Sequence, residues 1–273
     1  MWDFLAQEGV QRGINQAILL AGLVTARLVP VVYLVPYLGG QAIPQQVKMG
    51  IALALTVMVY PAVWQSGAAG ALPEASLHVA ALVVKELVVG LMLGFVAALV
   101  FEALRVAGQA IDNARGQTMA TSFVPQLKTQ ASVTADFLYQ LGVVMFLLIG
   151  GHRLMLAALT ESYVVVPPQS FPPMGEHLGA ITFGIVRLSA DAITLGVLLS
   201  FPAVAAIVLA NVMLALINKA APQINVFFLG MPLKAALGVA VVLFGLHVLV
   251  DQFVEEATLS IERVEHLVEL MAG

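Results

Sequence analysis

The sequence contains no cysteine, and only 10% of its residues are charged, whereas 60% are hydrophobic. Without cysteine, the chain has no disulfides, no thiolate metal site and no thiol nucleophile. Soluble domains carry about a quarter charged residues, so the scarcity of charge argues against one large soluble domain. The five histidines do not cluster, and the sequence has no HExxH, P-loop, GxGxxG or GxSxG motif. We therefore expect no metal, no cofactor and no enzymatic activity.

Long apolar runs take the place of the missing charges. A membrane-crossing helix needs about 20 mostly apolar residues. Uncharged runs of that length cover residues 28–47, 49–73 and 192–218, and shorter ones cover 87–101, 137–151 and 235–250. The shorter runs reach spanning length only if a flanking ionisable residue is included. The sequence therefore predicts an all-α, polytopic membrane protein.

The expected helices cover residues 14–36, 45–64, 77–112, 132–163, 178–217 and 224–270. Prolines interrupt many of them, namely Pro30, Pro36, Pro44, Pro61, Pro202, Pro222 and Pro232. Because an interior proline removes a backbone hydrogen bond, we expect kinked or broken helical hairpins. Freed carbonyls at membrane depth then need protein or water as partners.

The C-terminal segment differs from the rest. Residues 251–273 carry six acids and one base, and their apolar residues recur near helical spacing. We expect one helical domain over 1–250, with a loop at about 113–130, followed by an acidic amphipathic helix over 251–273. Helices that lie on a lipid surface usually carry basic polar faces, so this one is expected to dock on protein. The acidic charge also argues against a nucleic-acid partner.

Most ionisable residues in the apolar segments have an opposite charge nearby. Such pairs are Glu102 with Arg105, Asp112 with Arg115, Arg187 with Asp191, and Lys85 beside Glu86. Helical neighbours of opposite charge can pair locally, which favours a structural role over an ion relay. Arg27, Asp136, Lys219 and Lys234 have no opposite charge within four residues and are expected to contact other subunits or lipid headgroups. Gly90 and Gly94 form a GxxxG pattern, which permits close helix packing.

A polar segment lies between two apolar ones at residues 108–130, where twelve of the 23 residues are polar or charged. Such a segment cannot face lipid, because its hydrogen-bonding groups would lack partners there. It must line water, pack inside protein or lie at the membrane boundary. Its position in the middle of the chain favours a channel loop, a gate or a contact surface over a tail, and an ordinary solvated connector stays an equal alternative.

Three stretches carry a resemblance to a known family. They are ARLVPVVYLVPYLGGQAIPQQVKMGIALAL at 26–55, GQAIDNARGQTMAT at 108–121 followed by Pro125, and LINKAAPQINVFFLGMPLKAALG at 216–238. Together with GGHRLMLAALTESYVVVP at 150–167, they resemble the type III secretion export-gate family called SctT in injectisomes and FliR in flagella. IDNARG is closer to the injectisome members. Val124 stands where many members have an acid, so no loop carboxylate is expected there.

The resemblance implies a non-enzymatic structural and gating subunit of the export gate in the bacterial inner membrane. It implies assembly with SctR/FliP-like and SctS/FliQ-like subunits, contact with a SctU/FlhB-like switch protein, and passage of unfolded secreted polypeptides. It also implies that much of the complex lies on the periplasmic side, within the basal body. The alternatives are a secondary transporter with broken helices and, more remotely, an intramembrane hydrolase.

The resemblance further implies roles for individual residues. A channel plug is expected around Gly116–Gln126, formed by Gly116, Gln117, Thr118, Met119, Ala120 and Phe123. The residues expected to anchor it are Gln109, Asp112, Arg115 and Pro125. The residues expected to serve packing or assembly are Arg27, Pro30, Pro44, Gly90, Gly94, Pro222, Gln223, Asn225, Phe227, Gly230, Pro232 and Lys234. A flexible thioether such as that of Met119 suits a seal that must yield to a passing chain.

Overall fold

The computed structural model describes residues 2–40, 43–65, 75–116, 132–171 and 174–272, and all regular structure within these ranges is helical. Five of the described helices are long and apolar enough to cross a membrane, and a bent helix pair supplies a sixth candidate. The prediction of an all-α membrane protein is therefore confirmed.

The chain divides into two compact units. The first contains Met1–Ala98, Gly150–Leu188 and Thr258–Gly273, and the second contains Leu99–Ile149 and Ser189–Ala257. Three long helices contribute to both units: α4 (Ser76–Arg115), α8 (Met174–Ala220) and α9 (Val226–Ala272). The α9 helix runs without interruption through residues 250 and 251. The expected division into a domain over 1–250 and a C-terminal helix over 251–273 stays a prediction.

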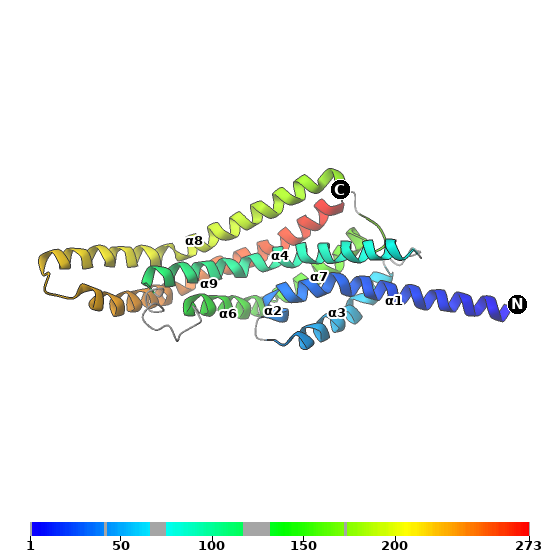
Figure 1. Ribbon diagram of the computed structural model, residues 1–273, viewed down its shortest axis with the longest axis horizontal. Helices are drawn as coiled ribbons and strands as arrows, with labels where there is room; N and C mark the ends of the chain where they lie inside the picture. The colour runs from blue at the N-terminus through cyan, green and yellow to red at the C-terminus, as the bar shows by residue number, and fades with distance from the viewer. Residues whose placement is uncertain (1, 41–42, 66–74, 117–131, 172–173, 273) are drawn as a thin grey trace. The chain divides into compact units, whose positions relative to one another are not determined.

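The first unit is built around α1 (Trp2–Leu34), which packs against α2 (Pro36–Gly39) and α3 (Gln45–Gln65). In Figure 1, α3 runs alongside α1. The α7 helix (Gly151–Val165) also packs on α3. The carbonyl of Pro44 accepts the N–H groups of Val47 and Lys48, which begins α3. The buried face of α1 is largely aliphatic, and besides Arg27 it includes Leu20, Leu23, Val24, Leu28, Val31 and Val32.

The second unit contains α6 (Val133–Leu148) with the adjoining parts of α4, α8 and α9. The ring of Phe101 is fully buried and lies against two other rings, with centroid separations of 5.3 Å to Phe146 and 5.9 Å to Phe253. Edge-to-face and tilted ring pairs at this spacing stabilise a core beyond their buried area. These contacts join α4, α6 and α9 inside this unit.

The segment expected as a single helix over 132–163 is two helices. The α6 and α7 helices meet at a bend of 75°. Gly150 has φ 77°, a left-handed conformation that suits glycine and ends the α-helical path. Four interior prolines behave differently, because helices continue through Pro30, Pro61, Pro202 and Pro232.

The last turns of α9 have one apolar and one acidic face. Ile261, Val264 and Leu267 are buried, whereas Glu262 and Glu265 are exposed. The apolar face of the C-terminal helix therefore lies inside this chain and not on an open surface. Its exposed acids give the helix a strongly negative outer face.

Candidate functional site

A buried salt bridge joins α1 to α4 in the first unit. Neither Arg27 nor Glu86 is exposed to solvent. Arg27 Nε donates to Glu86 Oε2 at 2.6 Å, and a second guanidinium nitrogen of Arg27 donates to Oε1 at 3.0 Å. This is a bidentate arginine–carboxylate pair, the geometry in which an ion pair is strongest. The other guanidinium contacts reach α7, at the carbonyls of Ser162 (2.7 Å) and Val166 (2.7 Å).

Lys85 adds a second buried cation to this cluster. Its ammonium lies 2.7 Å from Glu86 and donates to the carbonyls of Pro167 (2.9 Å), Pro168 (3.2 Å) and Ser170 (2.9 Å). Two cations thus share one carboxylate. The remaining positive charge is directed at backbone carbonyls beyond the C-terminus of α7, where the helix dipole is negative.

Aromatic contacts complete this cluster, which we call the buried charge cluster (Arg27, Lys85, Glu86, Ser162 and Tyr163). The guanidinium carbon of Arg27 lies 4.1 Å from the ring centre of Tyr163, and the Tyr163 hydroxyl donates to the carbonyl of Val24 at 2.9 Å. With every partner in place, the cluster fixes α1, α4 and α7 in one arrangement. Each charged group of the cluster has partners within this chain.

The expectation that Arg27 contacts another subunit or a headgroup is wrong, because its partners lie in this chain. The sequence did not reveal the pair, since Glu86 is 59 positions away. The expected local pair of Lys85 and Glu86 is present, as is that of Glu102 and Arg105 at 3.3 Å.

A second polar cluster lies in the second unit, at the ends of the segment 117–131. Asp112 is buried, and its Oδ2 accepts from the Ser132 hydroxyl at 2.6 Å and from the backbone N–H of Thr134 at 2.9 Å. Its other oxygen pairs with Arg115. One carboxylate therefore holds the last turn of α4 and the first turn of α6 together.

Each side of this cluster has the chemistry expected of a helix end. The hydroxyl of Ser132 accepts from the N–H of Ala135 at 3.3 Å and so caps α6. The Asp112 carboxylate lies at the N-terminus of α6, and Arg115 lies in the last turn of α4, so both charges oppose the helix dipoles. Gly116 follows with φ 84°, a conformation that ends a helix at little cost for glycine.

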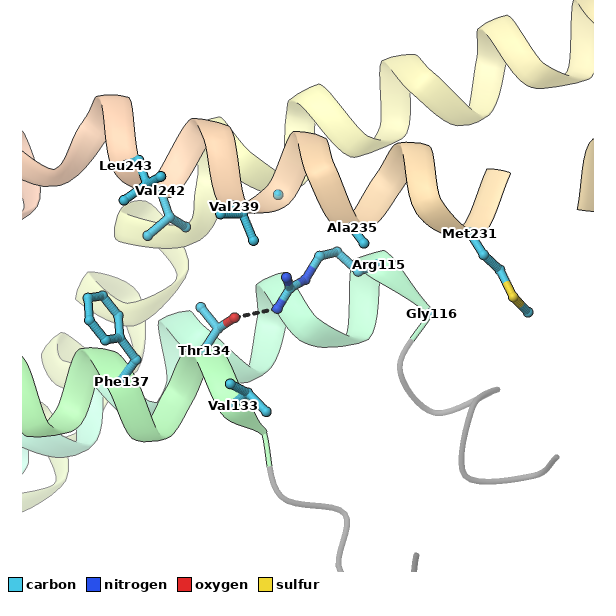
Figure 2. Close-up of a pocket in the computed structure, with 11 residues that line it drawn as sticks. Arg115, Gly116, Val133, Thr134, Phe137, Met231, Ala235, Val239, Val242 and Leu243 are labelled. Atoms are coloured by element: carbon cyan, nitrogen blue, oxygen red, sulfur yellow. Dashed lines mark hydrogen bonds between the residues drawn. The ribbon is translucent and has the colours of Figure 1, made fainter. Parts of the chain in front are cut away.

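The side chain of Arg115 lies between α4, α6 and α9 (Figure 2). It donates to the Thr134 hydroxyl of α6 and lies against Gly238 of α9. A Cβ at Gly238 would overlap Cδ of Arg115, so glycine is needed there for this close approach. We call Asp112, Arg115, Ser132 and Thr134 the loop-base cluster.

Glycines also set the closest helix approaches in both units. In the first, a Cβ at Gly90 would overlap the carbonyl oxygen of Arg27, and one at Gly94 would lie 3.0 Å from Cα of Val31. In the second, a Cβ at Gly108 would overlap the backbone of Ala135. The crossing of α4 and α6 is thus tightest one turn before Asp112. Larger residues at these glycine positions would keep the helices, and with them the charged groups, apart.

Several expected site residues lie outside the described residues: Gln117, Thr118, Met119, Ala120, Phe123 and Pro125. Gln109 is exposed on α4, one turn before the loop-base cluster. Pro222 and Gln223 lie in the turn between α8 and α9, and the side chain of Asn225 accepts the N–H of Phe228 at 3.4 Å. Phe227, Gly230 and Lys234 line a hollow in the second unit. Sequence reasoning missed the pairing of Glu86 with Arg27, and it missed Ser162, Ser132, Thr134 and Gly108, whose roles depend on contacts distant in sequence.

These features define a class: a multi-pass helical membrane protein stabilised by buried ion pairs. Comparison with known proteins narrows the class. Residues 18–259 match the family described as bacterial export proteins, family 1. The chain is 28% identical over 227 residues to the flagellar biosynthetic protein FliR of Caulobacter vibrioides, covering 83% of this chain and 88% of that protein.

Two secretion proteins are also similar. The Yop proteins translocation protein T of Yersinia pestis is 36% identical over 191 residues, covering 70% of this chain and 71% of that protein. The secretion system apparatus protein SsaT of Salmonella typhimurium is 32% identical over 199 residues, covering 70% and 72%. The chain therefore belongs to the SctT/FliR family of type III secretion export proteins. As a family member it is a multi-pass inner-membrane subunit of the type III export apparatus.

Proposed function

We propose that this chain is a structural and gating subunit of the export gate, without enzymatic activity of its own. It assembles with SctR/FliP-like and SctS/FliQ-like subunits and contacts a SctU/FlhB-like switch protein. Unfolded secreted polypeptides pass through the resulting channel. Much of the complex lies on the periplasmic side of the inner membrane. The higher identity to the two secretion proteins, 36% and 32% against 28% to FliR of Caulobacter vibrioides, favours an injectisome-type system.

The gating role rests on the loop-base cluster. Asp112 joins the end of α4 to the start of α6, so the described residues on either side of 117–131 are held together. A channel plug needs a fixed base and a tip that a passing chain can displace. We assign the tip to Gln117, Thr118, Met119, Ala120 and Phe123, and the base to Asp112 and Arg115.

Deletion of residues 117–122 tests this assignment in the assembled complex. The loop-base cluster is untouched by the deletion, so assembly should proceed as in the wild type. Small-ion conductance in planar bilayers should rise, because the tip no longer seals the channel. A deletion of 66–71, a different segment that connects α3 to α4, serves as the control and should not raise conductance. Unchanged conductance in an assembled complex that lacks 117–122 would refute the plug.

A secondary transporter is the competing function, because broken helices and charges at membrane depth occur in such proteins. In this chain the buried charges are saturated by protein partners, which leaves no open ion site within the buried charge cluster. Substrate-dependent ion flux in liposomes that contain this chain alone would favour the transporter.

A further inference from the structure

An apolar groove lies between α6 and α9 in the second unit, beside the loop-base cluster (Figure 2). Its volume is about 660 Å³, within the range of roughly 300–1,000 Å³ typical of ligand sites. Its walls include Val133, Phe137, Val239, Val242 and Leu243. The only polar side chains that line it belong to Arg115 and Thr134, which already bond each other. The groove therefore suits an apolar chain.

A second hollow, which Lys234 lines, lies next to the groove. This hollow of about 220 Å³ shares Arg115, Gly116 and Met231 with the groove, and it is also lined by Asn211. The charge of Arg115 is balanced by Asp112. Among the described residues, the structure records no ion pair for Lys234, so the positive charge in this hollow is uncompensated.

Lys234 lies within a candidate membrane span, Val226–Met271. An unpaired charge in a spanning segment is costly and calls for a partner. A partner that fits both hollows carries a negative charge and an attached apolar body, because the cationic hollow lies next to the apolar groove and shares Arg115, Gly116 and Met231 with it. We propose that the groove binds one anionic phospholipid, with an acyl chain along Phe137, Val239 and Val242 and the phosphate at Lys234.

The shape of the groove suits a lipid chain. An α-helix with side chains is about 10 Å wide. An extended acyl chain is narrower and can lie along a groove between two helices. Val133, Val239 and Leu243 are at least 49% exposed, so the groove is open to an entering lipid.

Lipid retention tests the proposal in the protein as it assembles. The full-length chain is extracted in mild detergent with its co-purifying subunits and washed in detergent that contains excess phosphatidylcholine. Retained phospholipid is then counted by mass spectrometry. We expect about one phosphatidylglycerol per chain. Lys234→Gln should lower its retention about fivefold, because one basic residue contributes about 1 kcal/mol to binding of an anionic lipid surface.

Matched variants separate charge from structure. Lys219→Gln removes an exposed lysine that lines none of these hollows, and it should retain the lipid. Lys234→Arg keeps the charge and should also retain it. Val239→Trp fills the groove and should release the lipid although Lys234 is present. Equal loss in the Lys219 and Lys234 variants, or retention in Val239→Trp, would overturn the site.

A direct contact measurement follows from the absence of cysteine in this chain. Phe137→Cys, labelled with a bimane fluorophore, should be quenched by phosphatidylglycerol spin-labelled on its acyl chain, and more weakly by the matching phosphatidylcholine. Equal quenching by the two lipids would contradict the proposal that Lys234 selects an anionic headgroup. Absence of quenching in the intact complex would mean that a protein segment fills the groove, and would overturn the proposal.

Discussion

At the residue scale, the buried charge cluster is the most demanding feature of the chain. Burial of ions costs several kcal/mol each unless opposite charges and hydrogen bonds replace water. Here Glu86 receives both Arg27 and Lys85, and the excess positive charge is directed at carbonyls near the end of α7. The cluster is therefore a fixed contact among three helices, and loss of its only carboxylate would leave two unbalanced cations.

We predict that Glu86→Gln destabilises the chain by about 3–5 kcal/mol, the usual cost of removing one partner of a buried pair. The thermal midpoint of the detergent-purified protein measures the effect. Glu102→Gln is the control, since its side chain is 46% exposed and its pair with Arg105 should contribute about 1 kcal/mol or less. Similar melting of the two variants would contradict a structural role for the cluster.

The loop-base cluster depends on the carboxylate of Asp112. Asp112→Ala removes the acceptor for Ser132, Thr134 and Arg115, and it leaves the charge of Arg115 unbalanced. Hydrogen exchange at the first turn of α6 should rise, because its backbone N–H groups lose their cap. Exchange in α1 should not change. Asn113→Ala, at the exposed neighbouring position, should behave as the wild type. Unchanged exchange in Asp112→Ala would show that Asp112 does not hold α6.

At the scale of elements, the positions of the helices followed from the sequence, and their contacts did not. Apolar runs and helix-ending residues are local signals, so the expected segments at 45–64 and 178–217 lie close to α3 (Gln45–Gln65) and α8 (Met174–Ala220). The bend at Gly150 was missed although Gly150 and Gly151 form a Gly-Gly pair, a dipeptide that marks turns, because apolar residues continue on both sides of the pair. The pairing of Arg27 with Glu86 depends on how α1 crosses α4, which no local pattern encodes.

Substitution of two glycines, one at a helix crossing and one in open space, tests how closely α1 and α4 pack. Gly90→Ala would place a methyl group on the carbonyl of Arg27, so α1 and α4 must separate and the thermal midpoint should fall. Gly22→Ala, at an exposed position of α1 with open space around it, should be neutral or stabilising by about 1 kcal/mol, because alanine favours helix. Equal effects of the two substitutions would show that helix propensity, and not close packing, determines the outcome at Gly90.

At the scale of the whole molecule, the parts of α8 and α9 in the second unit expose many large apolar side chains. Phe201, Phe228 and Phe244 are each at least 66% exposed. A helix that is apolar all round is stable only when lipid or protein covers it. The candidate spans of α8 and α9 are only 28% and 17% buried within this chain, so most of the cover must come from elsewhere. In the export gate that we propose, partner subunits supply this cover.

We predict that Phe228→Asp lowers recovery of the SctR/FliP-like and SctS/FliQ-like subunits with this chain at least tenfold. The introduced carboxylate would be buried without a partner at a packed surface, and such burial costs more than the roughly 1.4 kcal/mol that corresponds to a factor of ten. Asn218→Asp adds the same charge at an exposed polar position near the α8–α9 turn and should leave recovery unchanged. Co-purification from membranes, quantified against the tagged chain, measures both variants. Recovery of intact complex with Phe228→Asp would mean that this surface of the hairpin faces water or lipid in the assembled gate.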